Sequence, residues 1–161
     1  MKKTFEQEIE KGKWMFFVYS TPLPFPFNFA LHTWIVIISP DSEAHRYEIH
    51  MFKNKKHKEQ GYFYKDDEIL NVGLKKYLWK KEPKYDGKII VKISGEKWSL
   101  AQKVVEFIQK NIESYKFKKK YLHIPGPNCN TLTQWILDKF PEIGIKLPWN
   151  AFGKNYKIKS E

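Results

Sequence analysis

Two neighbouring segments rich in β-branched and aromatic residues constrain the fold of this chain more than any other feature. Residues 29–39 contain four consecutive β-branched residues at 35–38, which favour an extended strand. Residues 40–43 have the composition of a turn, and residues 46–52 again have strand character. This order predicts an antiparallel hairpin.

The other segments predict further strands and two main helices. Strands are expected at 14–20, 61–65 and 88–94, and helices at 99–115 and 129–140, where apolar residues recur with helical spacing. Residues 66–79 are compatible with either a helix or a loop. Because most strands precede the helices, we expect an α+β fold, an antiparallel sheet with two main helices packed on it. The sequence shows no repeat or linker, so we expect residues 1–161 to form a single domain, with 1–12 as a short helix or flexible arm.

The segment between the first two predicted strands, residues 21–27, alternates proline with apolar residues. Alternating prolines exclude a central strand and favour an extended conformation. One interpretation, and the commoner outcome, is a connecting loop whose aromatic side chains plug the core. The other is a rigid apolar lip over a site.

The single cysteine of the chain stands at the predicted start of the last helix. A Pro-Gly-Pro turn at 125–127 leads through Asn128 into Cys129, where the helical pattern begins. Unpaired backbone N–H groups and the positive end of the helix dipole at this position favour a thiolate, which is the nucleophilic form. A small buried cysteine in phase with Leu132 and Ile136 would fit the same pattern.

Asn128 and Asn130 flank this cysteine. In the catalytic interpretation they accompany an oxyanion hole formed by the backbone N–H groups of Cys129 and its neighbours. In the structural interpretation the two asparagines cap the helix.

A cysteine nucleophile needs a base within hydrogen-bonding reach and a third group that orients the base. His32 is the candidate base because it interrupts the predicted core strand, although a backbone carbonyl could satisfy a structural histidine there. Glu48 on the next strand could accept a proton from the imidazole if the hairpin register brings the two to one face. Its alternative is a surface ion pair with a lysine, and His50 is the alternative third member.

Composition limits the other classes of function. The chain carries 29 Lys and Arg against 18 Asp and Glu, a net charge of +11, and Arg46 is its only arginine. Nucleic-acid readers favour arginine, so a nucleic-acid partner is possible but less expected than a small-molecule, peptide or lipid acyl substrate.

One cysteine excludes an internal disulfide and a multi-cysteine zinc site. With no phosphate loop and no metalloprotease motif, we expect no metal and no cofactor. The apolar run 14–19 is too short for a transmembrane segment, and with no signal peptide we expect a cytoplasmic protein.

Three motifs together resemble a bacterial family of unassigned function over roughly residues 29–155. They are His32-Thr33-Trp34-Ile35, Arg46-Tyr47-Glu48, and Pro125-Gly126-Pro127-Asn128-Cys129-Asn130-Thr131 with Ile143–Pro148. The order of histidine, polar residue and Asn-Cys also resembles circularly permuted papain-like proteins. That group includes lecithin:retinol acyltransferase-like proteins and relatives of the NlpC-type cell-wall peptidases. The resemblance implies a permuted papain-like fold, with Cys129 as nucleophile, His32 as base and Glu48 as third member.

The sequence therefore predicts a cysteine hydrolase or acyltransferase that acts on an amide, ester or thioester. A non-catalytic binding module with the same cleft is the second hypothesis. The third is a basic surface protein that binds nucleic acid or anionic membrane through lysine clusters at 55–56 and 118–119.

Overall fold

The computed structural model describes residues 5–23, 25–41, 44–51, 61–65, 87–118 and 120–157. Within these residues, five strands, β1 to β5, and two main helices, α3 and α4, follow a short N-terminal helix, α1. A 3-10 turn follows each main helix, η2 and η3. The bounds are α1 Phe5–Glu8, β1 Trp14–Pro22, β2 Leu31–Ile38, β3 His45–Met51, β4 Gly61–Lys65, β5 Lys88–Gly95, α3 Leu100–Asn111, η2 Ile112–Ser114, α4 Cys129–Lys139 and η3 Pro141–Ile143. The open question of helix or loop at 66–79 and the lysine pair at 55–56 lie outside the described residues.

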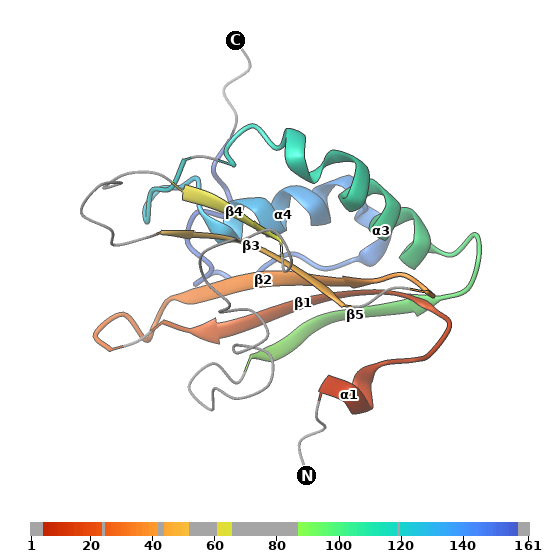
Figure 1. Cartoon of the computed structure of the whole chain (residues 1–161). Coiled ribbons are helices and arrows are strands. Elements are labelled where there is room, and N and C mark those ends of the chain that lie inside the picture. Colours follow the sequence, from red (N-terminus) through yellow and green to blue (C-terminus); the bar gives the residue numbers. More distant parts are fainter. Residues whose placement is uncertain are drawn as a thin grey trace.

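The strands form one antiparallel sheet in the order β4-β3-β2-β1-β5 (Figure 1). Both main helices contact this sheet: α3 packs on β1 and β5, and α4 packs on β2 and β3. The predicted α+β class, an antiparallel sheet with two helices packed on it, is confirmed. The predicted strand at 61–65 is confirmed as the edge strand β4.

The core lies on both faces of the sheet. On the helical face, Phe16 and Ile35 pack against α3 and α4 side chains such as Val104 and Ile136. On the opposite face a second cluster forms around Phe17, Tyr19, Trp34 and Val36, with α1 packed against it. Because β1 is central and covered on both sides, its sequence is a continuous apolar run rather than an alternating one.

The favoured interpretation of the loop between β1 and β2, that its aromatic side chains plug the core, is wrong. Phe25 is 88% exposed and Phe27 is 59% exposed, so these side chains do not plug the core. Backbone bonds from Leu23 N to Ala30 O and from Ala30 N to Phe27 O close the loop on itself beyond the end of the strands. The strands' own side chains already fill both core faces, so the loop side chains face outward.

No helix within the described ranges is both long and apolar enough to cross a membrane.

Candidate active site

The register of the β2–β3 hairpin decides which side chains meet at the site. Val36 pairs with Arg46, at the middle of a short ladder that runs from the pair Ile35–Tyr47 to the pair Ile37–His45. Because side chains alternate between faces, His32 and Trp34 share the face of Val36, and Glu48 shares the face of Arg46. The predicted placement of His32 and Glu48 on one face is therefore confirmed.

Cys129, His32 and Glu48 form a continuous hydrogen-bonded chain. His32 Nδ1 lies 2.9 Å from Cys129 Sγ, and His32 Nε2 lies 2.7 Å from Glu48 Oε2. The Arg46 guanidinium donates to the same carboxylate oxygen at 2.8 Å. Glu48 and Arg46 are buried, so the interpretation of Glu48 as a surface residue paired with a lysine is wrong. A buried carboxylate needs this charge compensation to stay ionised.

Trp34 forms a rigid wall beside this chain. Its indole stacks on the His32 ring at 5.7 Å between centroids, and the Arg46 guanidinium lies 4.5 Å from its centroid. Tyr19 stacks on the same indole at 5.5 Å and nearly parallel. A cation held over a tryptophan face is attracted to the ring, so Trp34 helps to fix both cationic partners of Glu48.

The start of α4 is anchored by Asn128, which confirms its predicted role as a helix cap. Asn128 Oδ1 accepts bonds from the N–H groups of Asn130 and Thr131, and Thr131 Oγ1 accepts the Asn128 N–H. The Asn128 amide nitrogen donates to the carbonyls of His123 and Phe152. The cap therefore also ties the segment that leads into α4 and the more distant segment around Phe152 to the residue that precedes the cysteine.

Asn130 connects the helix to the strand that bears His32, and it is not the cap. Its amide nitrogen donates to the carbonyls of Leu31 and Phe152, at 2.9 and 2.8 Å. Its Oδ1 accepts the hydroxyl of Thr33 at 2.9 Å. These bonds hold the first turn of α4 against the strand that bears His32.

The helix cap uses two of the backbone N–H groups that were expected to form the oxyanion hole. The N–H groups of Asn130 and Thr131 donate to Asn128 Oδ1. Within the described part of the chain, the Cys129 N–H is the one donor among these three without a protein acceptor. The sharing of the hole by the neighbours of Cys129 stays a prediction, and in this structure the capping side chain of Asn128 accepts the N–H groups of Asn130 and Thr131.

The charges at the site favour an imidazolium–thiolate pair. Burial raises the pKa of the Cys129 thiol, but the His32 ring and the Thr33 backbone N–H outweigh burial and lower the pKa. Burial lowers the pKa of His32, but the adjacent sulfur and the Glu48 carboxylate outweigh burial and raise the pKa. Each ionised partner therefore stabilises the other.

Three site residues had no assigned role in the sequence prediction. Arg46 and Trp34 could have been found, because each lies two residues from a candidate on the same strand face. Tyr121 had no signal in the sequence. Burial, followed by the charge of the Cys129 sulfur, raises the pKa of Tyr121.

Two other histidines, His50 and His123, lie near the site residues in the sequence. His50 lies in β3, and its side chain is outside the described residues, so its role as an alternative third member stays a prediction. His123 is exposed and packs edge-on against Tyr121 at 5.3 Å. In the described part of the chain, no group of three or more His, Cys, Asp or Glu side chains could hold a metal ion.

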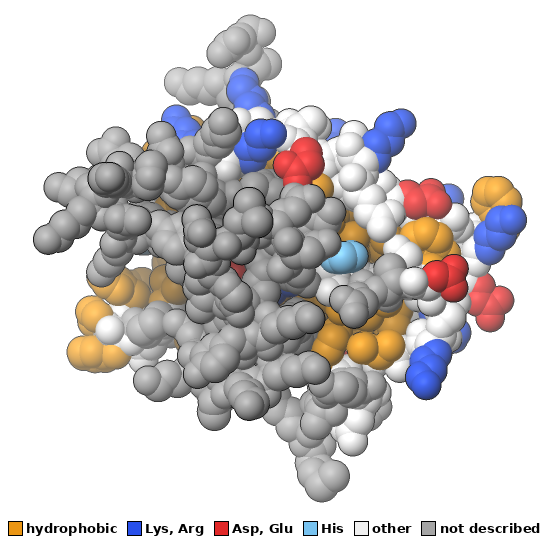
Figure 2. All heavy atoms as spheres, in the orientation of Figure 1, with side chains coloured by type: hydrophobic (Ala, Val, Ile, Leu, Met, Phe, Trp, Pro, Cys, Tyr) orange, Lys and Arg blue, Asp and Glu red, His pale blue; other side chains and the backbone are white. Residues whose placement is uncertain are grey.

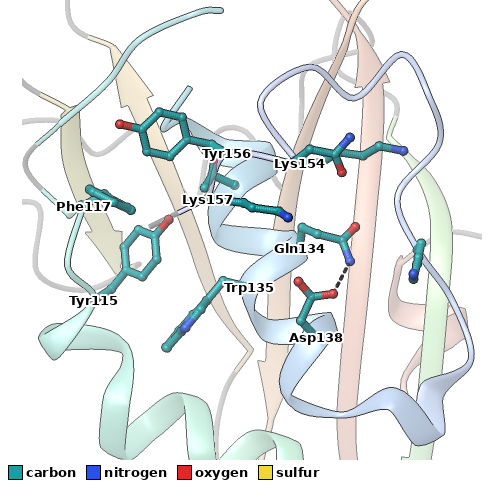
Figure 3. A pocket seen from close by; sticks show the side chains of 11 residues that line it. Tyr115, Phe117, Gln134, Trp135, Asp138, Lys154, Tyr156 and Lys157 are labelled. Carbon is teal, nitrogen blue, oxygen red and sulfur yellow. Dashed lines mark hydrogen bonds between the residues drawn. The ribbon is translucent and has the colours of Figure 1, made fainter. Parts of the chain in front are cut away.

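A separate cavity of about 460 Å³ lies against another part of α4 (Figure 3). Tyr115, Phe117 and Trp135 form one side of it, and Lys154 and Asp138 lie on the other. Cys129, His32 and Glu48 are not among its described lining residues. The cavity is therefore distinct from the Cys129 site.

The fold and the site together define an α+β protein with a cysteine at a helix start, paired with a strand histidine and a buried carboxylate. Residues 14–156 match the family described as "Protein of unknown function (DUF3750)", and the chain belongs to this family. No curated protein and no solved structure matches the chain.

Proposed function

We propose that this protein is a cysteine hydrolase or acyltransferase of circularly permuted papain-like type, acting on an ester, thioester or amide. The observation that carries the proposal is the contact of Cys129 Sγ with His32 Nδ1 at 2.9 Å, while the other ring nitrogen contacts Glu48. A nucleophile, a base and an orienting group in this geometry are the elements of nucleophilic catalysis. The permuted papain-like assignment is supported by the chain order, histidine before carboxylate before cysteine.

The chemistry would run through an acyl-enzyme. The Cys129 thiolate attacks the substrate carbonyl carbon, and the resulting oxyanion accepts a bond from the Cys129 N–H at the positive end of α4. As the tetrahedral intermediate collapses, the His32 imidazolium gives its Nδ1 proton to the leaving oxygen, sulfur or nitrogen. Water, or an acceptor hydroxyl or amine, then attacks the thioester. His32 removes the proton of this second nucleophile, and the thiolate is released.

Glu48 acts in this scheme as a positioning residue. Its carboxylate accepts the Nε2–H of His32, which directs Nδ1 toward the sulfur. The guanidinium of Arg46 keeps that carboxylate ionised in a buried position. The carboxylate therefore orients the imidazole and stabilises its cationic form without touching the substrate.

The test is acyl transfer from p-nitrophenyl esters of short and long chain length. We expect a burst of about one nitrophenol per protein, an acyl adduct on Cys129 in the mass spectrum, and turnover that Cys129→Ala abolishes. His32→Ala should remove turnover, and Glu48→Gln should lower turnover while shifting its pH profile, since it acts through His32. An adduct that forms equally well in His32→Ala and never turns over would refute the proposal, because it would show a reactive thiol without a catalytic base.

A further inference from the structure

Exposed apolar side chains gather around the start of α4. Of the eight large hydrophobic residues that are exposed in the described part of the chain, six belong to the segments 23–31, 121–128 and 147–153. Isolated exposed apolar residues are ordinary on protein surfaces, but a contiguous exposed group indicates an interaction site. We call these six residues the apolar rim: Phe25, Phe27, Phe29, Leu122, Ile124 and Trp149.

Hydrogen bonds bring the three segments to the residues on either side of Cys129. Asn130 donates to Leu31 O and Phe152 O, and Asn128 donates to Leu122 O and Phe152 O. The rim therefore does not lie at a random place on the surface. All three segments contact the first turn of the helix that carries the candidate nucleophile.

Ring contacts make part of the rim continuous. Phe27 packs on Phe29 at 6.4 Å between centroids, Phe29 packs on Phe152 at 6.1 Å, and Phe152 packs on Trp149 at 6.5 Å. Asn150 fastens the two loops to each other, because its side chain donates to Phe29 O. Figure 2 shows hydrophobic side chains gathered at the left edge of the molecule, where Figure 1 draws the loop between β1 and β2.

The stretches of chain that adjoin the rim segments are basic. The rim segments 23–31, 121–128 and 147–153 contain no Lys, Arg, Asp or Glu, whereas the adjoining stretches 115–120, 143–146 and 154–157 contain seven lysines and no aspartate or glutamate. Three of these lysines, Lys146, Lys154 and Lys157, line the separate cavity against α4. Lysines beside exposed aromatic and aliphatic side chains are the combination that binds an anionic membrane surface: the rings enter the headgroup region and the lysines attract anionic lipids.

We infer that the apolar rim docks on the surface of an anionic phospholipid membrane. The aliphatic Leu122 and Ile124 favour lipid over single-stranded nucleic acid, which stacks on rings and gains little from aliphatic side chains. The only arginine, Arg46, is buried in the site and cannot contact phosphate at the surface. Docking in this orientation brings Cys129 to the lipid interface. The consequence that its substrate is a lipid acyl group rests on the proposed function, whereas the docking itself does not.

Flotation with vesicles tests the docking. We expect binding to vesicles of phosphatidylcholine with phosphatidylglycerol, weak binding to phosphatidylcholine alone, and a decrease as salt rises. Trp149→Ser and Phe25→Ser should each weaken binding by on the order of tenfold, because each removes a large apolar surface from the interface. Trp98→Ser is the matched control: Trp98 is 78% exposed against 77% for Trp149, but it lies in the turn before α3. Its loss should leave vesicle binding unchanged.

Three results would overturn the inference. The first is equal binding to anionic and neutral vesicles. The second is an equal loss of vesicle binding in Trp98→Ser and Trp149→Ser. The third is binding of oligo-dT, weakened by Trp149→Ser but not by Trp98→Ser, in a protein that does not bind vesicles. The two proposals fail separately, because Cys129→Ala should keep full vesicle binding and Trp149→Ser should keep the reactivity of Cys129. Vesicle binding without ester turnover would remove the catalytic proposal and leave the membrane surface in place.

Discussion

Replacing His32 with alanine should slow the alkylation of Cys129 by iodoacetamide at neutral pH. The imidazolium is the group that holds the thiol ionised, since its Nδ1 lies 2.9 Å from the sulfur and burial acts in the opposite direction. In His32→Ala burial remains while the compensating charge is lost. The thiol should then be protonated at pH 7.

The expected size of the rate decrease follows from the distance between His32 Nδ1 and Cys129 Sγ and from ordinary thiol chemistry. Opposite unit charges 2.9 Å apart attract by about 6 kcal/mol at an effective dielectric constant of about 20. Ionising a thiol of pKa about 8.5 at pH 7 costs only about 2 kcal/mol, so the attraction suffices even when burial offsets part of it. An ordinary thiol is about 3% ionised at pH 7, so the thiolate fraction should fall at least about 30-fold, and the remaining burial lowers it further. We expect the rate to fall at least about tenfold, because a thiolate of low pKa is intrinsically less nucleophilic and this offsets part of the loss.

The assay is the second-order rate of iodoacetamide labelling, followed by mass spectrometry of the intact folded protein. His123→Ala is the matched control, because His123 is exposed and precedes the same helix. Its rate should equal that of the wild type. Circular dichroism of each variant shows whether the fold is retained.

Two outcomes would refute the reasoning in different ways. A wild-type Cys129 that is labelled only after denaturation would be a structural thiol, in keeping with its 3% exposure, and the catalytic proposal would fail. A reactive Cys129 with the same rate in His32→Ala would show that the helix end alone activates the thiol. In that case the assignment of His32 as the base would be wrong.

Gly153→Ala should lower the melting temperature more than Gly144→Ala. Both glycines have a positive φ, 89° at Gly153 and 71° at Gly144. A Cβ at Gly153 would lie 2.3 Å from Asn128 Nδ2, whereas a Cβ at Gly144 would meet no atom within 4 Å. Equal losses in thermal unfolding would show that the Asn128 cap tolerates displacement. The stabilisation by the Cys129–His32 pair should be greatest between about pH 6.5 and 8.5, the unfolded values of the two groups. The Cys129 contribution, from a lowered pKa, is lost as pH falls, and the His32 contribution, from a raised pKa, is lost as pH rises. The difference in urea unfolding free energy between the wild type and the double alanine variant should therefore fall on both sides of this window, by at most about 1.4 kcal/mol per pH unit, and a pH-independent difference would contradict it.

The sequence alone predicts the elements of the fold and the position of each candidate within them. The β-branched run that became β2 and the apolar phase of α4 are local patterns, because backbone conformation depends mainly on neighbours in the chain. The position of Cys129 in the first turn of α4 is predicted in the same way, from the asparagine before it. His32 stands out because a polar ring interrupts an apolar strand.

Only the tertiary structure decides what these residues contact. The register of the hairpin places Glu48 against His32, and a slip of one residue would turn Glu48 to the other face. The bonds of Asn130 depend on segments far apart in the chain, because they reach Leu31 O and Phe152 O. Sequence patterns record local conformation and burial, whereas a catalytic geometry depends on distances between residues such as Cys129 and His32, 97 positions apart, which packing alone determines.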